Sequence, residues 1–156
     1  MARFLMLVAF CMLPAVVSAG HPFWLEGWVH CDTCQFGFET PLSTFIEGAT
    51  VIVECKDSMD MQVTYEAEAV TGPDGRWEME VDEDHHDELC TVRLFRSPLV
   101  GCRVPDPGHN SASLILTRYN GVVSNRHCAN SMGFFKDTPL HGCAALRSLY
   151  QLSYEA

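Results

Sequence analysis

The sequence predicts an all-β protein, a disulfide-stapled β-sandwich or barrel of about seven strands with little helix. Three observations lead to this prediction. Short segments alternate apolar and polar residues with a period of two, turn-forming residues separate them, and several cysteines are spread along the chain. Because no long amphipathic helical pattern is present, a mixed α/β fold is not expected.

Each expected strand rests on its own pattern. The first is rich in aromatic residues, the second is a β-branched run, and the third and fourth alternate strictly. The last is an apolar run that resembles a buried strand. In chain order the strands are expected at Phe23–His30, Ala49–Lys56, Met61–Val70, Trp77–Val81, Cys90–Arg96 and Ala112–Thr117.

The turn sequence Gly72–Gly75 contains Pro73 and Asp74 and predicts a hairpin between the third and fourth strands. Tyr119–Leu140 has little periodicity and much Gly, Asn and Ser, so a loop is expected there. The segment "CAALRSLYQL", residues 143–152, fits either a short helix or a last strand.

Residues 1–19 are expected to be a cleaved signal peptide. Arg3 precedes the apolar run Phe4–Val17, and small residues precede a possible cut after Ala19. The run has about 14 residues, whereas a helix that spans a membrane needs roughly 20. We therefore expect residues 20–156 to form a single secreted domain without membrane insertion.

The sequence is acidic, with a formal net charge of −10 at pH 7, which becomes −11 once the leader with Arg3 is removed. Such a chain has no electrostatic reason to bind nucleic acid or anionic lipid, and a charged partner is expected to be basic. Seven cysteines follow the leader, and an oxidising compartment favours three disulfides and one leftover thiol. Six cysteines allow about 15 pairings, so counting does not choose among them.

The stretch "CDTC" places Cys31 and Cys34 three positions apart. A redox pair of this kind needs a strand-to-helix junction, and the segment after Cys34 has no helical stripe. A zinc site needs a second pair of ligands at close spacing, and among the remaining cysteines only Cys128 has a neighbouring histidine, His127. Two separate disulfides are therefore the favoured interpretation.

The acidic run Glu78–Leu89 contains His85 and His86 and has two interpretations. It could bind calcium or a basic peptide, or it could be a solvated hairpin tip between strands. The second is favoured, since the Gly and carbonyl ligands of a calcium loop are not seen at their usual offsets. His21 would bind copper only if cleavage exposed it as the first residue. No lipase elbow, P-loop or paired zinc-histidine motif is present, and no cofactor is expected.

The stretch "EGWVHCDTCQ" resembles the signature of the pollen allergen and extensin family, the group that contains the major olive pollen allergen. His30 stands where the family usually has Tyr, and Gln35 where it usually has Arg. The spacing of the later cysteines is similar to the six-cysteine framework of the family over nearly the whole mature chain. The matching residues are Glu26, Gly27, Val29, Cys31, Asp32 and Cys34.

The resemblance implies a disulfide pairing and leaves one cysteine over. Cys128 is the extra cysteine. Three alternatives are open for it: a buried free thiol, a disulfide bridge in a dimer, or a partner that exchanges with the other disulfides. Cys55 and Cys90 lie on the apolar faces of their expected strands, so their bond is also reasonable from the residues alone. The implied pairs are Cys31–Cys102, Cys34–Cys143 and Cys55–Cys90.

The resemblance also implies a secreted plant protein of the extracellular space or cell wall without enzymatic activity. Its expected role is recognition or signalling, in pollen-tube or other tissue growth, through binding a receptor-kinase ectodomain or a wall component. The expected binding loops are Phe36–Gly48 and Tyr119–Leu140. The first alternative is a structural wall protein, which the lack of a proline-rich extensin-like tail makes less favoured. The second alternative is a thiol-redox or copper enzyme.

Overall fold

The computed structural model describes residues 21–121 and 123–150. The expected signal peptide, residues 1–19, and the end of the segment 143–152 lie outside these residues. Within the described part, no helix is long and apolar enough to cross a membrane.

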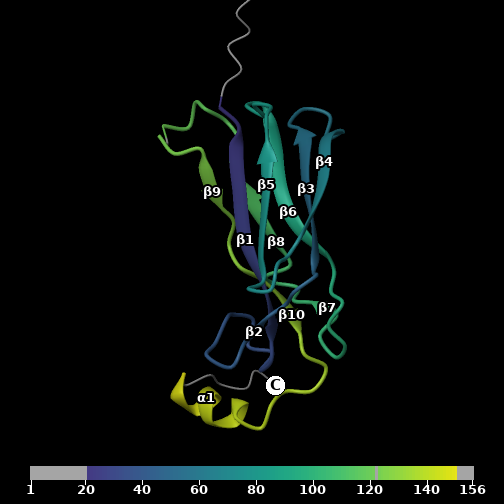
Figure 1. The fold of residues 1–156 in the computed structure, drawn as a ribbon, viewed down its shortest axis with the longest axis vertical. Coiled ribbons are helices and arrows are strands. Elements are labelled where there is room, and N and C mark those ends of the chain that lie inside the picture. Colours follow the sequence, from purple (N-terminus) through teal and green to yellow (C-terminus); the bar gives the residue numbers. More distant parts are fainter. Residues whose placement is uncertain (1–20, 122, 151–156) are drawn as a thin grey trace, which may run out of the picture.

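The described residues form ten strands and one short helix (Figure 1). The all-β prediction is therefore confirmed, and the open question about the C-terminal segment is settled as a helix. The elements are β1 (Phe23–Asp32), β2 (Thr44–Phe45), β3 (Thr50–Asp57), β4 (Val63–Val70), β5 (Arg76–Val81), β6 (Glu88–Arg96), β7 (Val104–Pro105), β8 (Ser111–Leu114), β9 (Arg126–Cys128), β10 (Met132–Phe135) and α1 (Cys143–Leu149).

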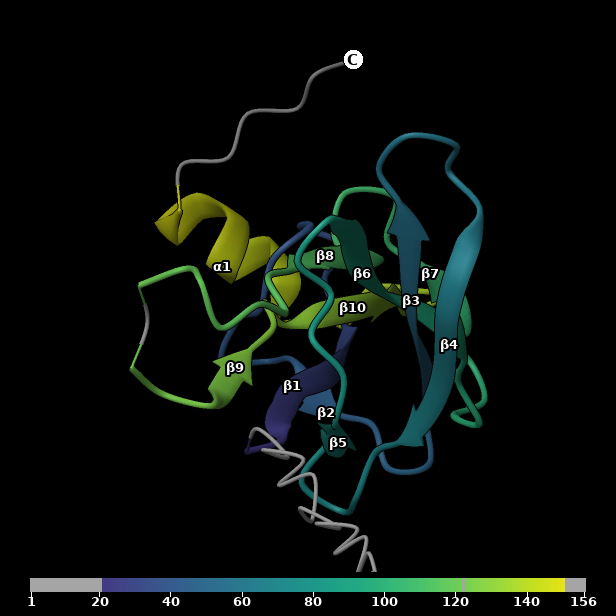
Figure 2. The same ribbon diagram turned by 90° about the horizontal axis from the view of Figure 1, so that it is seen from above.

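Four strands form an antiparallel sheet in the order β4-β3-β6-β8. Alternation fixes which face of this sheet is buried: Val51, Val53 and Cys55 of β3 point into the core, as the period of two predicts. Val92 of β6 lies opposite Val53 and is equally buried. In the view from above, β3 and β4 lie on one side of the molecule, and β1 and β9 on the other (Figure 2).

The second sheet is organised by the long strand β1. Its first half pairs with β5 and, in parallel, with β9. Its second half pairs with β2 and, again in parallel, with β10, whose other neighbour is β7. One strand thus links the upper part of the molecule in Figure 1 to its lower end.

The core lies between the two sheets and contains side chains from both. Trp77 of β5 is fully buried and lies directly opposite Gly27 of β1. A Cβ atom on Gly27 would lie only 2.7 Å from Nε1 of Trp77. The glycine in the sequence signature therefore leaves room for the indole ring to cover the strand.

The prediction that Tyr119–Leu140 is a loop is wrong, because β9 and β10 lie within it. Both strands are short, and Met132, Gly133 and Phe134 of β10 are all buried. A strand buried on both faces shows no alternation, so its sequence carries no period of two.

The predicted hairpin is also wrong, although its turn is present. The amide of Gly75 donates to the carbonyl of Gly72 over 2.9 Å, and Gly75 has a φ of 71°. After the turn, however, β5 pairs with β1, whereas β4 pairs with β3 in the other sheet. Alternation identifies a strand but not its partner, so the crossing between sheets was not predictable from it.

Candidate functional site

Three disulfides join Cys31 to Cys102, Cys34 to Cys143, and Cys55 to Cys90. This is the pairing that the family resemblance implies. Cys31 at the end of β1 and Cys34 just after it bond to two different segments far along the chain, with sequence separations of 71 and 109. Neither of them is free to act as a redox pair with the other.

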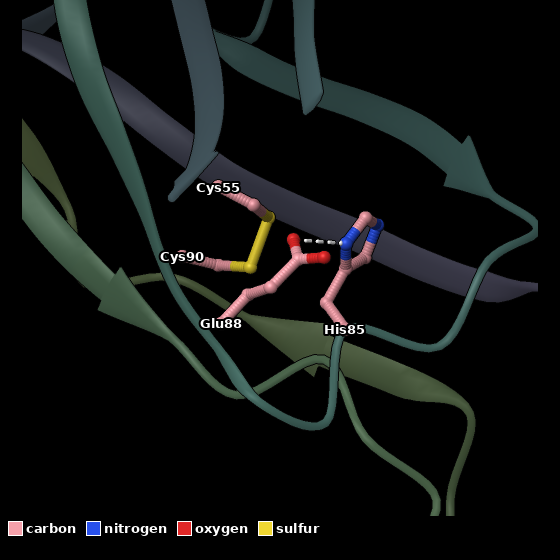
Figure 3. Close-up of side chains that lie close together, drawn as sticks. All are labelled: Cys55, His85, Glu88 and Cys90. Atoms are coloured by element: carbon pink, nitrogen blue, oxygen red, sulfur yellow. Dashed lines mark hydrogen bonds and ion pairs between the residues drawn. A yellow bond between two sulfur atoms is a disulfide. The ribbon is translucent and has the colours of Figure 1, made fainter. Parts of the chain in front are cut away.

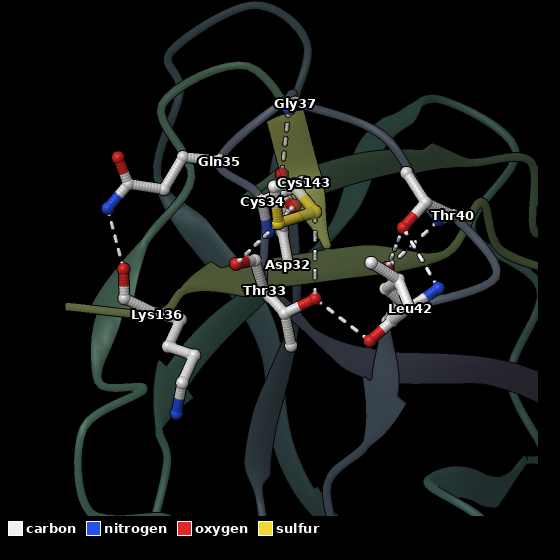
Figure 4. Close-up of a disulfide and its surroundings, with 10 residues drawn as sticks. Asp32, Thr33, Cys34, Gln35, Gly37, Thr40, Leu42, Lys136 and Cys143 are labelled. Atoms are coloured by element: carbon white, nitrogen blue, oxygen red, sulfur yellow. Dashed lines mark hydrogen bonds between the residues drawn. A yellow bond between two sulfur atoms is a disulfide. The ribbon is translucent and has the colours of Figure 1, made fainter. Parts of the chain in front are cut away.

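Asp32 organises the loop that follows β1 (Figure 4). Its carboxylate is completely buried. One oxygen accepts a hydrogen bond from the amide of Cys34 at 3.1 Å, and the other accepts from the amide of Gly37 at 2.7 Å. Gly37 has a φ of 81°, a conformation that favours glycine. The signature aspartate therefore satisfies the buried amide of Cys34, which would otherwise lack a partner, and the partly buried amide of Gly37.

Further hydrogen bonds tie this loop to the segment before α1. The amide of Leu140 donates to the carbonyl of Thr33 at 3.1 Å, and the hydroxyl of Thr33 donates to the carbonyl of Leu42 at 2.8 Å within the loop itself. The side-chain amide of Gln35 donates to the carbonyl of Lys136 at 2.6 Å. Gln35, which stands in place of the usual arginine, thus anchors the loop to the chain that leaves β10.

The anchored loop presents aromatic side chains next to helix α1. The rings of Phe36 and Phe38 lie 5.9 Å apart, and Phe38 meets Tyr150 edge-on at 5.6 Å. The guanidinium of Arg147 lies 5.3 Å from the Phe36 ring. We call this region, Gln35–Gly48 with Cys143–Tyr150, the basal surface. Exposed aromatic and arginine side chains are enriched at protein interfaces.

His30 lies buried behind the basal surface. Its Nδ1 is 2.9 Å from the hydroxyl of Ser131, which in turn donates to the Glu39 carboxylate at 3.2 Å. A Cβ on Gly133 would lie 2.9 Å from the His30 ring. Burial lowers the pKa of His30, and the charges of Glu39 and Asp32 oppose this shift. The residue that replaces the usual tyrosine is therefore a neutral imidazole held by a hydroxyl.

The signature glutamate, Glu26, binds two arginines of neighbouring strands. It forms ion pairs with Arg76 of β5 and, at 2.9 Å, with Arg126 of β9. The hydrogen bond from Arg76 and then that from Cys128 lower the pKa of this carboxyl. Glu26 thus clamps β9 onto the sheet.

Cys128 is exposed and is the one free cysteine among the described residues. Its thiol donates to Glu26 at 3.1 Å. That bond to a carboxylate, followed by desolvation, raises the pKa of the Cys128 thiol. The thiol is thereby kept protonated, and the thiolate needed for exchange chemistry is disfavoured.

The first part of the second expected binding loop, Tyr119–Leu140, lies away from the basal surface. Tyr119 and Val123 belong to the connection between β8 and β9, at the upper end of the molecule in Figure 1, away from α1. There the amide of Trp24 donates to the carbonyl of Asn125 at 2.8 Å. Phe23 and neighbouring residues line a pocket of about 290 Å³ at this end. The later part of the same expected loop does reach Phe36–Gly48, because the hydroxyl of Ser131 donates to the Glu39 carboxylate at 3.2 Å.

The acidic run Glu78–Leu89 does not form a hairpin tip, because β5 and β6 belong to different sheets. Its middle is partly solvated, as expected, with Glu83 and His86 exposed. His85, in contrast, is buried and lies 2.7 Å from Glu88. The expectation of a wholly solvated segment is therefore wrong at His85.

Comparison with known proteins decides the family. The family model described as "Pollen protein Ole e 1 like" matches residues 21–151. The chain belongs to this family. It is 50% identical over 136 residues to the protein Downstream of FLC from Arabidopsis thaliana, covering 87% of this chain and 83% of that protein. It is 37% identical over 150 residues to pollen allergen Che a 1 from Chenopodium album, covering 91% and 88%.

A solved structure agrees with this assignment. The major plantain pollen allergen Pla l 1 superposes with a TM-score of 0.70 at 26% sequence identity, over 78% of this chain and 99% of the allergen. The disulfide-rich fold and the membership in the Ole e 1-like family are together consistent with a secreted protein.

Proposed function

We propose that this Ole e 1-like protein is a secreted, non-enzymatic recognition module of the plant extracellular space or cell wall. The partner is a protein, such as a receptor-kinase ectodomain, and the contact is made by the basal surface. The observation that carries the proposal is the combination of a braced loop and exposed aromatic rings at one place. Asp32 and the Cys34–Cys143 disulfide fix the loop, and Phe38 remains 37% exposed on it.

Bracing matters because ordering a flexible loop on binding costs affinity. A side chain that is rich in rotamers loses about 0.5–1.5 kcal/mol when a partner immobilises it. Here the loop is held before any partner arrives, by hydrogen bonds from the backbone of Cys34 and Gly37 to Asp32. Aromatic rings add large contact areas at low entropic cost.

Charge supports a basic partner. With a formal net charge of −10, the protein attracts a positively charged surface and accelerates the encounter, an effect that salt weakens. The pollen origin of the allergens to which the chain is similar supports a role in pollen-tube or related tissue growth. The protein acts as a monomer unless Cys128 forms an intermolecular bridge.

A binding experiment with paired variants tests this proposal. Oxidised, secreted protein is titrated against a panel of purified receptor-kinase ectodomains. The variant Phe36→Ser/Phe38→Ser is expected to weaken binding at least about tenfold, as loss of aromatic hot-spot residues does. Tyr119→Ser is the matched control, because Tyr119 is 80% exposed and lies in the other expected loop.

Three results would contradict the proposal. Binding that is lost in Tyr119→Ser and retained in the phenylalanine variant moves recognition to the opposite end of the molecule. Retention on intact cell walls through salt washing, with no ectodomain bound, indicates a structural wall protein. Catalytic reduction of insulin disulfides indicates a thiol-redox enzyme.

A further inference from the structure

Four side chains with metal-binding atoms meet beside the four-stranded sheet: Cys55, His85, Glu88 and Cys90 (Figure 3). One ligand atom of each lies within 4.8 Å of all the others. They come from two places. Cys55 and Cys90 are directly paired in β3 and β6. Glu88 is the first residue of β6, and His85 lies in the turn that leads into this strand.

His85 is held in this cluster without full hydrogen bonding. The residue is 4% exposed, and its ring lies 5.1 Å from that of Tyr65. Its Nδ1 is 2.7 Å from a Glu88 oxygen, which also accepts from the hydroxyl of Thr64 at 2.6 Å. Its Nε2 is buried and has no hydrogen-bond partner in the described part of the chain. A buried polar atom of this kind requires a physical explanation.

In the oxidised protein the cluster is not a metal site. The disulfide uses the sulfur valences of Cys55 and Cys90, and the thiolate form of cysteine is the metal ligand. Only the imidazole of His85 and the carboxylate of Glu88 remain available, and two ligands do not make a structural zinc site.

We propose that reduction of the Cys55–Cys90 disulfide converts this cluster into a tetrahedral site for Zn²⁺. A dithiol reductant transfers two electrons and two protons: the S–S bond breaks, two thiols form, and the dithiol becomes a cyclic disulfide. Binding of Zn²⁺ then releases the two thiol protons, and the ion is held by both thiolates, the imidazole of His85 and the carboxylate of Glu88.

The donor set suits zinc in number and kind. Zn²⁺ takes four ligands in tetrahedral geometry from thiolate, imidazole and carboxylate, with bonds of about 2.0–2.3 Å. Such bonds place the ligand atoms about 3.3–3.8 Å from one another. Atoms that already lie within 4.8 Å therefore need only small side-chain shifts.

The backbone keeps the ligands together after the disulfide is broken. Cys55 and Cys90 sit in a ladder in which β3 pairs with β6 from Thr50 to Asp57. Asp57 pairs with Glu88, so the carboxylate stays fixed relative to the two sulfurs. The amide of Glu88 also donates to the carbonyl of His85 at 3.2 Å, which holds the imidazole one turn away.

A groove gives reductant and ion a route to the cluster. It has a volume of about 410 Å³, and His85, Glu88 and Cys90 form part of its lining. The other two disulfides have no comparable group of ligands: among the residues at 21–121 and 123–150, this cluster is the one such set. The site is thus specific to Cys55–Cys90.

The experiment uses the secreted, oxidised protein and Co²⁺ as a spectroscopic probe for Zn²⁺. Before reduction, neither ion is expected to bind tightly. After reduction with a water-soluble phosphine, which is oxidised to its phosphine oxide, one Co²⁺ per chain is expected to give the sulfur-to-metal absorption of a tetrahedral thiolate site. Zn²⁺ should displace it and protect Cys55 and Cys90, but not Cys128, from alkylation.

Variants show whether the four named residues form the site. His85→Gln and Glu88→Gln should each weaken Co²⁺ binding to the reduced protein at least about tenfold. Substitution of a residue that only hydrogen-bonds to a metal ligand already lowers metal affinity by about that factor. His109→Gln is the matched control. His109 contacts Asp106 at 3.1 Å with the same spacing of three residues, but it has no cysteine in its cluster.

Each remaining outcome overturns the proposal. One such outcome is that the reduced protein is folded, as near-ultraviolet circular dichroism shows, but binds no Co²⁺. Another is that His85→Gln and Glu88→Gln bind Co²⁺ as tightly as the wild type does. Tight Co²⁺ binding before reduction contradicts the dependence on thiolates. Reduction that unfolds the chain, with no recovery of structure when Zn²⁺ is added, shows that the ligands are not held in place.

Discussion

The disulfide within the four-stranded sheet and the disulfide that holds helix α1 have opposite surroundings. Cys55 and Cys90 are opposite each other in a ladder that pairs Val51–Asp57 of β3 with Glu88–Leu94 of β6 without interruption. Cys143 is the one buried residue of α1, a seven-residue helix without a side-chain cap. The first bond duplicates contacts that the sheet already makes, whereas the second is the main anchor of its segment.

Loop length alone would predict that the Cys34–Cys143 disulfide contributes more to the free energy of unfolding than the Cys55–Cys90 disulfide. The sequence separations are 35 for Cys55–Cys90 and 109 for Cys34–Cys143. The chain-entropy estimate gives about 4 and about 5 kcal/mol of stabilisation, respectively. That estimate assumes that the folded state is unchanged when the bond is cut. The two regions differ in whether this assumption holds.

The largest loss of global stability is expected for Cys55→Ala/Cys90→Ala. The free energy of unfolding should fall by about 4 kcal/mol, because the unfolded chain gains freedom and the folded ladder does not. Urea denaturation measures this loss. Amide hydrogen exchange should show that β3 and β6 still open only with global unfolding.

A smaller global loss, about 2 kcal/mol, is expected for Cys34→Ala/Cys143→Ala, although its loop is longer. Here the folded state gains freedom as well, because an isolated helix of this length is not stable in water. The amides of α1 should lose their protection from hydrogen exchange. If urea denaturation instead shows the greater loss in this variant, loop length governs both disulfides and the contrast between the regions fails.

Asp32→Asn is expected to cost about 1–2 kcal/mol, because charge-assisted bonds to the amides of Cys34 and Gly37 become weaker neutral ones. Asp74→Asn is the control: its carboxylate also accepts a backbone amide, that of Arg76 at 3.1 Å, but in an exposed turn. Urea denaturation of both variants gives the comparison. Equal losses would show that burial adds nothing to the role of Asp32.

The four-stranded sheet was largely predictable from the sequence, whereas in the β1 sheet only β1 and β5 were expected as strands. The strand β6 alternates cleanly because one of its faces is solvated, so Cys90, Val92 and Leu94 identify the buried side. The strand β3 is buried from Thr50 to Val53 and was recognisable by its β-branched run. The strands β9 and β10 pair in parallel with a strand about a hundred residues earlier. Nothing local in "RHC" or "MGFF" specifies that partner.

The candidate surface was predictable in part. The loop Phe36–Gly48 was expected from the resemblance, and the signature residue Asp32 proves to brace it. The contributions of Arg147 and Tyr150 could not be predicted, because they arise only when Cys143 brings α1 beside the loop. The burial of His85 was missed because its acidic neighbours suggested a solvated segment.

Acid should reduce the stability of the second half of β1 and of β10, beside His30, before that of the four-stranded sheet. Burial lowers the pKa of His30 below its ordinary value of 6.5, so between the two values the unfolded chain binds more protons than the folded one. Stability is therefore full above about pH 6.5 and is lost as the pH falls toward the lowered pKa. Desolvation of His127 acts in the same direction.

The variant His30→Gln, which cannot titrate, isolates this contribution. Its urea midpoint should fall less between pH 7.5 and pH 5.5 than that of the wild type, and the remaining slope belongs to His127 and the carboxylates. Hydrogen exchange at pH 5.5 should show the extra opening in the second half of β1 and in β10, where Ser131 and Gly133 face His30. An unchanged slope in the variant would mean that protonation of His30 is not linked to unfolding in this range.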